Sequence, residues 1–483
     1  MKILFVSSEV APFAKTGGLG DVSAALPRHL AALGHDVRTF VPMYSRVHAA
    51  GRSFTEVVPE IVFRLGDLRV QVSIYASTFP GTNVPVYFVR CPPLYDRASI
   101  YGSGPDEHLR FAVLCWAALA ACQHLGFAPD IAHVNDWQGS LIPLLLKTMF
   151  AWDRLFSRTR SVLTIHNIGH QGTFDARVLP ETGLADAAGL VHQDELRAGR
   201  FSFLLTGILH ANALTTVSPT YAREIQTPEH GVRMDPYLRM RKDVLFGILN
   251  GIDEGEWNPE IDTRIPQRFS AEDLSGKERC KAELLESAGL PYRREIPVLG
   301  IVSRLVWQKG FDLCMPVLPG LLQRRAFQLI ILGTGEAKYE EFFRALARAF
   351  PRQVAYQPSF SENLAHRIEA GADAFLMPSR YEPCGLNQMY SLRYGTLPIV
   401  HRTGGLADTV WPVEGERGTG FVFEHFDERG LAWAINRALD VWGSGTGGDR
   451  ERWRRLQRTG MGLPLGWDHR VGEYVELYRR LGS

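Results

Sequence analysis

Short apolar runs that alternate with helical patterns constrain the fold of this chain more than any other feature of its sequence. The first run, Ile3–Ser7, leads into a glycine-rich turn. A helical pattern over residues 22–33 then precedes a second apolar run, Val37–Val41. A run that is apolar throughout is typical of a strand buried on both faces, as strands in parallel sheets are. The alternation therefore predicts an α/β fold with a mostly parallel, doubly wound sheet.

The runs fall into two series, one on each side of the turn-rich stretch NGIDEGEWNP that begins at Asn250. A chain of 483 residues is also too long to form a single hydrophobic core. We therefore predict two doubly wound domains, residues 1–250 and 251–464, and a helix over 465–483. The glycine-rich stretch 443–448 is typical of a flexible loop. The further runs of the two series are Val86–Val89, Ile131–Val134, Val162–Ile165 and Leu214–Val217, and then Val298–Val302, Leu329–Leu332, Val354–Tyr356, Ala374–Met377 and Pro398–Val400.

Charge and cysteine content exclude several classes of partner. The formal net charge is +1, so nothing favours binding to nucleic acid or to an anionic membrane. The 6 cysteines are scattered without a C-x-x-C pair, which argues against a disulfide framework and against a structural zinc site. The apolar N-terminal run is short and leads into a turn, so we do not interpret it as a signal peptide, and no stretch is apolar for long enough to span a membrane. These features predict a soluble, cytoplasmic protein.

Residues that follow the apolar runs form the candidate site, because ligands of open α/β sheets bind beyond the carboxyl ends of the strands. The first motif is KTGGLGD, with Lys15 at its start and Gly18 at its centre. Glycines let backbone N–H groups approach an anion, the following helix adds a favourable dipole, and Lys15 adds a full charge. The alternative is a tight turn with a solvated lysine, since the motif matches neither G-x-G-x-x-G nor the P-loop pattern.

Two further motifs follow apolar runs of the first series. The motif HVNDWQ, residues 133–138, places polar groups, Asp136 among them, beside a tryptophan. Such a set suits a sugar, whose hydroxyls need hydrogen bonds and whose faces stack on aromatic rings. The motif TIHN, residues 164–167, places His166 at the end of the next run. Each motif also has a structural interpretation: a strand end with a core tryptophan in the first case, and a structural histidine in the second.

A basic motif, SRLVWQKG at residues 303–310, directly follows the first run of the second series. Arg304 offers a bidentate fork for phosphate oxygens, and Lys309 offers a mobile point charge. Two cations beside a buried strand end therefore predict an anion site, and a diphosphate fits both of them. A solvated loop is the alternative interpretation.

The strongest motif is SRYEPCGLNQ, residues 379–388, which follows the run Ala374–Met377. Pro383 restricts Glu382 to an extended conformation, and the Glu382 carboxylate can accept hydrogen bonds from sugar hydroxyls. A helical pattern begins near Gly385, where free backbone N–H groups can hold phosphate or sugar oxygens. A glycine turn, RTGGL at residues 402–406, could add another wall.

The sequence contains no Asp-x-Asp motif and no group of His, Asp and Glu at metal-ligand spacing. Arg304, Lys309 and the helix N-terminus would then neutralise a diphosphate by themselves. We therefore predict a reaction that needs no metal ion and no organic cofactor.

In order and spacing these motifs resemble those of bacterial glycogen synthases and plant starch synthases. The resemblance rests on KTGGLGD, SRLVWQKGFD, SRYEPCGLNQMYSLRYGTLPIV and RTGGLADTV, and it runs along the whole chain. It implies two Rossmann-like domains that face each other across a cleft, the GT-B arrangement. The first is the acceptor-side domain, on which the C-terminal helix packs, and the second binds the nucleotide sugar. It also implies a glycogen synthase, which transfers glucose from ADP-glucose to the non-reducing end of an α-1,4-glucan with retention of configuration.

The resemblance also assigns roles to single residues. Of the candidates, we expect four to act in catalysis: His166, Arg304, Lys309 and Glu382. The others are expected to bind substrate. Lys15 and Gly18 match the family's donor-binding loop, and Arg304 and Lys309 match its diphosphate-binding pair. Positions that hold the glucose match Glu382, Cys384 and Gly385, and backbone donors to the distal phosphate match Leu386 and Asn387. His166 and Asn250 match residues near the transferred sugar.

Two positions depart from related patterns. Gln138 stands where the family commonly has a histidine, and Tyr390 stands where many related retaining transferases have a second glutamate. The first departure suggests one alternative, a catalytically weak glucan-binding homologue. A different GT-B enzyme, such as a phosphorylase or a sugar epimerase, is a second alternative. A glycogen phosphorylase would need a lysine for pyridoxal phosphate near the C-terminal end, and no lysine follows Lys338.

Overall fold

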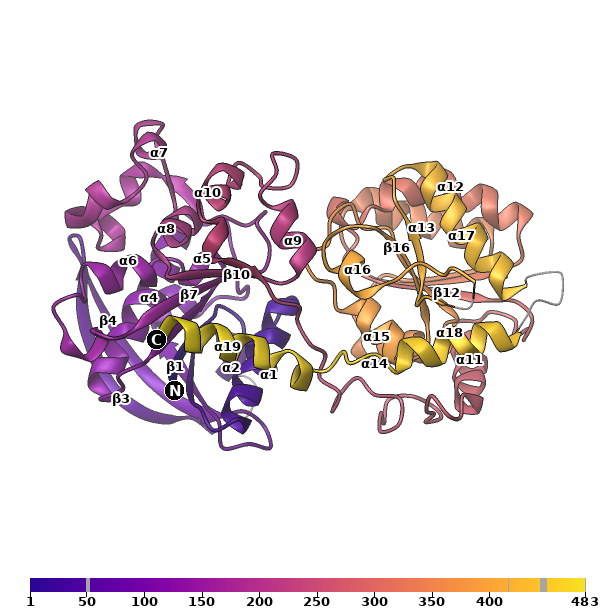
Figure 1. Ribbon diagram of the computed structural model, residues 1–483, viewed down its shortest axis with the longest axis horizontal. Helices are drawn as coiled ribbons and strands as arrows, with labels where there is room; N and C mark the ends of the chain where they lie inside the picture. The colour runs from indigo at the N-terminus through magenta and orange to yellow at the C-terminus, as the bar shows by residue number, and fades with distance from the viewer. Residues whose placement is uncertain (49–52, 416, 444–449, 483) are drawn as a thin grey trace. The chain divides into compact units, whose positions relative to one another are not determined.

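The chain folds into two compact units (Figure 1). The computed structural model describes residues 1–48, 53–415, 417–443 and 450–482. Unit 1 comprises Met1–Asn250 and the C-terminal segment from Trp467, and unit 2 comprises Gly251–Gly466. Apart from Gly443, the glycine-rich stretch 443–448 lies outside the described residues, so its prediction as a loop stays a prediction.

Unit 1 is built on a mixed sheet. Its strands are β1 (Lys2–Val6), β2 (Asp36–Pro42), β3 (Thr55–Leu65), β4 (Leu68–Thr78), β5 (Pro85–Arg90), β6 (Ile131–Asn135), β7 (Arg160–Ile165), β10 (Ala213–Thr216) and β11 (Leu245–Gly247), and β8 (Thr173–Asp175) and β9 (Arg200–Ser202) form a separate ribbon. The order is β11-β10-β7-β6-β1-β2-β5-β4-β3. The chain leaves β1 toward one side and later returns to its other side, so the order reverses between β1 and β6. Ligands of such sheets bind beyond the strand ends at this reversal.

The helices of unit 1 connect these strands and cover the sheet (Figure 1). They are α1 (Gly18–Ala32), α2 (Ser45–His48), α3 (Pro92–Tyr95), α4 (Glu107–His124), α5 (Asp136–Gly139), α6 (Ile142–Lys147), α7 (Gln193–Arg197), α8 (Phe203–His210), α9 (Pro219–Glu224), α10 (Asp235–Met240) and α19 (Val471–Gly482). The last of these packs beside α1, where Tyr474 and Tyr478 join the buried cluster around Phe5 and Leu30. His133 fixes α19 to the sheet, because its Nδ1 lies 2.6 Å from the Tyr478 hydroxyl and its Nε2 lies 2.6 Å from Thr164 Oγ1.

The long hairpin β3–β4 was not predicted. Both of its pairings, β3 with β4 and β4 with β5, are antiparallel. In β4, buried and exposed residues alternate over much of its length, so the strand lacks the continuously apolar run that marks the parallel strands. Pro59 interrupts β3, and the register of the pair shifts around it, between Val58 and Ile61. Proline is tolerated there because β3 is the edge strand of the sheet.

Unit 2 is built on a sheet whose strand pairs are all parallel. Its strands are β12 (Val298–Val302), β13 (Gln328–Leu332), β14 (Val354–Gln357), β15 (Ala374–Met377), β16 (Leu397–His401) and β17 (Phe421–Phe423). They run in the order β14-β13-β12-β15-β16-β17, which reverses between β12 and β15. The predicted parallel α/β fold is confirmed here, and the basic motif and the SRYEPCGLNQ motif follow the two strands at the reversal.

The helices of unit 2 are α11 (Ser275–Ser287), α12 (Phe311–Arg324), α13 (Ala337–Ala349), α14 (Glu362–Gly371), α15 (Asn387–Arg393), α16 (Gly404–Thr409), α17 (Glu428–Trp442) and α18 (Arg450–Met461). The connecting segment from Gly251 is fixed to this unit by aromatic stacking and by a buried ion pair. The Trp257 ring lies between His366 and Tyr390, with centroid distances of 3.7 and 3.9 Å. Lys281 on α11 pairs with Asp373 at 2.8 Å.

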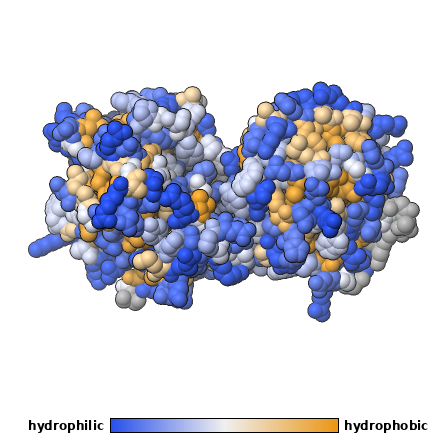
Figure 2. Space-filling model, turned by 90° about the horizontal axis from the view of Figure 1, so that it is seen from above, coloured by the Kyte–Doolittle hydropathy of each residue, from blue (hydrophilic) through white to orange (hydrophobic). Residues whose placement is uncertain are grey.

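The surface agrees with the balanced composition. On the face drawn in Figure 2, hydrophilic residues cover most of both units. Within the described residues, none of the helices has the length and apolar character that crossing a membrane requires.

Candidate active site

A glycine loop joins β1 to α1 at the reversal point of unit 1. Gly17 is the N-cap of α1 and Gly18 is its first residue, so the loop presents the N-terminus of a buried helix. Lys15 does not stand free in this loop, because its Nζ lies 2.6 Å from Asp21 Oδ1. The two side chains remain partly exposed. The pairing would have to loosen for Lys15 to bind a substrate anion, and its donor-binding role stays a prediction.

Glu9 organises this loop, and sequence reasoning missed it. The side chain is 3% exposed. Its carboxylate accepts hydrogen bonds from the Thr16 backbone N–H at 2.5 Å, the Thr16 hydroxyl at 2.6 Å and the Gly17 N–H at 3.2 Å. It also accepts one from the Tyr101 hydroxyl at 2.6 Å. A buried carboxylate needs such partners, so Glu9 and the loop hold each other in one conformation. The available signal was an acidic residue shortly after an apolar strand, with only Ser7 and Ser8 between β1 and Glu9.

Asp136 and His166 meet at the ends of the neighbouring strands β6 and β7. Asp136 Oδ1 accepts a hydrogen bond from the His166 backbone N–H at 2.7 Å, and His166 Nε2 lies 2.9 Å from Asn135 Oδ1. Asp136 has a φ of 51°, in the left-handed region that residues other than glycine rarely adopt. Strained residues of this kind concentrate at functional sites. The two motifs predicted from the first series therefore form one cluster.

Burial sets the charge of this cluster. It raises the pKa of Asp136 to about 7, although the His166 and Asn167 backbone N–H groups oppose the shift. It lowers the pKa of His166 to about 3, so the imidazole is neutral at physiological pH. With Asn135 Oδ1 as acceptor, the His166 proton lies on Nε2, and Nδ1 is left as an acceptor.

Two buried amide oxygens of unit 1 lack a hydrogen-bond donor among the residues described, Oδ1 of Asn250 and Oε1 of Gln138. Both side chains are 5% exposed. A buried polar atom without a partner costs about 1–3 kcal/mol of stability, and a ligand hydroxyl that donated a hydrogen bond to it would remove this cost. This supports the prediction that Asn250 binds substrate, and glutamine at position 138 likewise has an acceptor oxygen without a donor.

In unit 2, the basic motif follows β12 in a turn fixed by the backbone of the next loop. The Leu305 N–H donates to the Thr334 carbonyl at 2.8 Å, and the Glu336 N–H donates to the Leu305 carbonyl at 2.7 Å. Arg304 in this turn is exposed, and its guanidinium forms no hydrogen bond or ion pair with any described residue. Its full set of donors is therefore available to an anion.

Lys309 and Glu382 form an ion pair at the reversal point of unit 2. Lys309 Nζ donates to Glu382 Oε2 at 2.6 Å, and the Ser379 hydroxyl donates to the same oxygen at 2.9 Å. Glu382 is 5% exposed. Its Oε1 accepts no hydrogen bond from a described residue and remains available to a sugar hydroxyl. The two residues were predicted separately, one for the diphosphate and one for the glucose, and the structure brings them into contact.

The backbone around Glu382 is packed too closely for side chains at the flanking glycines. A Cβ on Gly404 would lie 1.9 Å from the Glu382 carbonyl oxygen, and one on Gly405 would lie 2.1 Å from the Cys384 carbonyl oxygen. Gly385 has a φ of 72°. The RTGGL turn therefore packs against the backbone of Glu382 and Cys384, and glycine is required at positions 385, 404 and 405.

The segment that leads from Glu382 into α15 has free backbone N–H groups directly before the helix. Those of Gly385 and Leu386 donate no hydrogen bond within the described residues, while the Asn387 side chain donates to the Val302 carbonyl of β12 at 2.6 Å. Gln388, which was not predicted, holds the loop through hydrogen bonds from its Nε2 to the Cys384 and Gly385 carbonyls, both at 3.0 Å. Free N–H groups at a helix start suit a phosphate.

One group in the described residues has metal-ligand spacing: Glu256, Glu362 and His366. Arg264 already occupies its centre, since its guanidinium lies 3.1 Å from Glu256, 3.9 Å from Glu362 and 3.4 Å from His366. A metal ion would have to displace this cation, so the group carries no metal site in our account.

Comparisons with known proteins agree on one family. The starch synthase catalytic domain family matches residues 2–240, and the family of glycosyl transferases group 1 matches residues 288–458. A glycogen synthase of Anaeromyxobacter dehalogenans is 48% identical over 100% of this chain and 99% of its own length. One of Thermotoga maritima is 43% identical over 99% of both chains.

The chain belongs to the glycogen and starch synthase family. The solved catalytic domain of starch synthase IV from Arabidopsis thaliana, bound to ADP and acarbose, covers 99% of both chains with a TM-score of 0.91 and 32% identity. This match confirms the predicted GT-B fold class, and the family confirms that the chain is a glycosyltransferase. Sucrose-phosphate synthase from Thermosynechococcus elongatus, 18% identical with a TM-score of 0.61, shares the fold alone.

The role of Glu9 is testable by Glu9→Gln. The substitution keeps the volume but places an amide N–H₂ against donors, so the loop before α1 loses part of its support. We expect transferase kcat/KM to fall by about tenfold or more, with far-UV circular dichroism unchanged. Tyr101→Phe removes one of the hydrogen bonds to Glu9, together with the contact between the Tyr101 and Ser8 hydroxyls, and should have a smaller effect. Wild-type kinetics of the Gln variant would show that the loop does not need this carboxylate.

The raised pKa of Asp136 predicts a pH dependence. Below about pH 7 the carboxyl is protonated, and above it the carboxylate can accept hydrogen bonds from sugar hydroxyls, so kcat/KM should rise through pH 7. His166 cannot cause this limb, because burial lowers its pKa to about 3. Asp136→Asn should be slower and should lose the limb. A limb that persists unchanged in the variant would assign it to another group.

Proposed function

We propose that this chain transfers glucose from ADP-glucose to the non-reducing end of an α-1,4-glucan such as glycogen, with retention of configuration. Relatives named glycogen synthase along the full chain support the reaction, and a relative's structure with ADP and acarbose supports a nucleotide-sugar donor and a glucan acceptor. One observation carries the proposal for this chain. At the reversal point of its sheet, unit 2 combines the Lys309–Glu382 pair with an unpaired Arg304.

Unit 2 is proposed to bind the donor. The Arg304 guanidinium and the free N–H groups of Gly385 and Leu386 bind the diphosphate, and Lys309 lies between this anion and Glu382. As the bond to the anomeric carbon lengthens, negative charge grows on the departing diphosphate. Fixed cations and N–H dipoles stabilise that charge more than the ground state, which is electrostatic catalysis.

Glu382 is proposed to orient the glucose. Its Oε2 is already used by Lys309 and Ser379, which lowers the nucleophilicity of the carboxylate, while Oε1 is available to a hydroxyl. The acceptor hydroxyl therefore attacks on the face that the diphosphate leaves, and a departing phosphate oxygen takes its proton. This route gives retention without a covalent glucosyl-enzyme.

Unit 1 is proposed to bind the transferred sugar and the acceptor. A glucosyl group that departs from phosphate acquires oxocarbenium character. A neutral His166 adds no opposing positive charge, and the carboxylate of Asp136 supplies a negative one. Asn250 offers the sugar its unpartnered Oδ1.

The other expectations have unequal support. The glucan-binding homologue with weak catalysis gains none from the comparisons, and Lys309, Glu382 and Arg304 are all present. The cytoplasm remains the proposed location, because the cysteines at positions 91, 115, 122, 280, 314 and 384 are buried thiols outside any disulfide, as suits a reducing compartment.

The function is tested by glucose incorporation into glycogen, with ADP-glucose and UDP-glucose compared side by side, with and without EDTA. We expect incorporation from ADP-glucose that survives EDTA, because Arg304 and Lys309 supply the charge that a metal would otherwise supply. Arg304→Ala should reduce kcat/KM by roughly a hundredfold.

The matched control for the arginine is Arg429→Gln, at an exposed position of α17, which should leave kcat/KM within about twofold of wild type. No incorporation from either donor would contradict the proposed reaction. Incorporation that EDTA abolishes would contradict the neutralisation of the diphosphate by protein groups alone, and a threefold effect or less in Arg304→Ala would contradict the role of that residue.

A further inference from the structure

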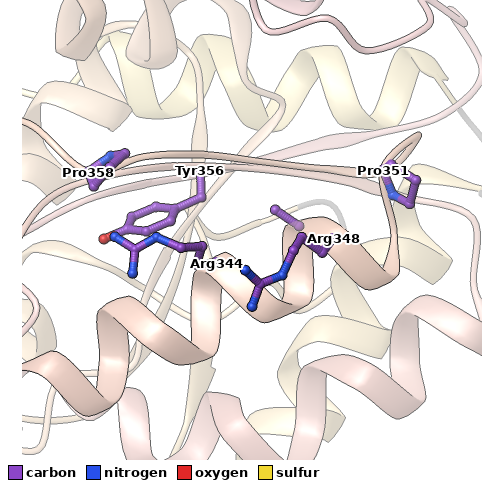
Figure 3. A pocket seen from close by; sticks show the side chains of 6 residues that line it. Arg344, Arg348, Pro351, Tyr356 and Pro358 are labelled. Carbon is purple, nitrogen blue, oxygen red and sulfur yellow. The ribbon is translucent and has the colours of Figure 1, made fainter.

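A pocket of about 490 Å³ lies in unit 2 between helix α13 and strand β14 (Figure 3). Two arginines extend from successive turns of the helix, an aromatic ring from the strand lies beside one of them, and a proline stands at either end. The lining residues are Arg344, Ala347, Arg348, Pro351, Tyr356 and Pro358.

This pocket is separate from the candidate active site. Strand β14 is the edge strand of its sheet, and β13 lies between it and the reversal at β12 and β15. None of the residues proposed for glucosyl transfer lines the pocket. Its chemistry therefore requires an explanation of its own.

The two guanidinium groups give the pocket an excess of positive charge. Arg344 and Arg348 are one helical turn apart, which places their Cβ atoms about 5–6 Å apart on one face of α13. Arg344 forms a long ion pair with Glu340, at 3.7 Å, which offsets one of the two charges. Arg348 is exposed and forms no ion pair with a described residue.

Tyr356 supplies a fixed aromatic wall. The ring is half-buried and packs against Phe343 at a centroid distance of 5.9 Å. Its hydroxyl donates to the Gly333 carbonyl at 3.2 Å, which fixes the ring in the plane seen in Figure 3. The Arg344 guanidinium lies 6.0 Å from the centroid of this ring, and Pro358 and Pro351 add apolar contact at the two ends of the pocket.

We propose that this pocket binds a small organic phosphate, namely a phosphate ester that carries one sugar-sized ring. Two adjacent guanidinium groups match the oxygens of a phosphate better than any neutral group does. The Tyr356 ring and the prolines then provide the apolar contact that a bare phosphate ion could not use. The volume falls within the range of small-molecule sites, which is about 300–1,000 Å³.

The test is calorimetric titration of the full chain with glucose 1-phosphate, inorganic phosphate and glucose as separate probes. We expect the ester to bind more tightly than phosphate, and glucose to show no measurable binding. The double variant Arg344→Gln/Arg348→Gln should weaken ester binding at least tenfold. The matched control Arg429→Gln/Arg454→Gln, which removes two exposed arginines elsewhere in unit 2, should bind within about twofold of wild type.

Tyr356→Ala tests the contribution of the aromatic ring independently of the two arginines. It should weaken binding of the ester and leave binding of inorganic phosphate unchanged. The proposal is overturned if wild-type protein binds no ester, if the double arginine variant binds it as wild type does, or if glucose binds as tightly as the ester. The altered arginines are exposed, whereas Tyr356 is half-buried, so circular dichroism is used to check that each variant, Tyr356→Ala above all, is folded.

Discussion

The ion pair between Lys309 and Glu382 is the interaction on which the geometry of the candidate site in unit 2 depends. It joins the turn after β12 to the loop after β15, the two strands between which the sheet order reverses. A carboxylate that is 5% exposed would be strongly destabilising without a cation, so the two loops hold each other in place. Close backbone contact around Glu382 then requires glycine at positions 404 and 405. The motif SRYEPCGLNQ and the turn RTGGL therefore pack together around this carboxylate.

A buried carboxylate has a similar place in unit 1. Glu9 follows β1 and holds the glycine loop that starts α1, as Glu382 follows β15 and is held beside the start of α15. In both units the polar groups gather where the strand order reverses, because only there do loops diverge and leave room for a ligand. The two carboxylates differ in the groups that pair with them. Glu9 is satisfied by neutral N–H and hydroxyl groups, whereas Glu382 is satisfied by a lysine that a phosphate can also attract.

Much of the fold could be predicted from the sequence, because strands buried on both faces show continuous apolar runs. The run over Val298–Val302 matches strand β12 to the residue. The hairpin β3–β4 was missed because neither strand is a continuous apolar run: exposed residues recur along both strands, and Pro59 interrupts β3. Motifs after the strands also identified most candidate residues, but not how they pair. Contacts such as Lys309 with Glu382 or Lys15 with Asp21 depend on side-chain directions that local sequence does not specify.

The most direct test of this account is a double-mutant cycle on kcat/KM with Lys309→Met and Glu382→Gln, measured with ADP-glucose and glycogen. If the two residues act as one unit, either single change leaves a buried charge without its partner, and the double variant should be little slower than the slower single variant. We expect a coupling of at least about tenfold, or about 1.4 kcal/mol. Effects that multiply independently to within threefold would contradict it, and would show that the pair seen here is incidental to catalysis.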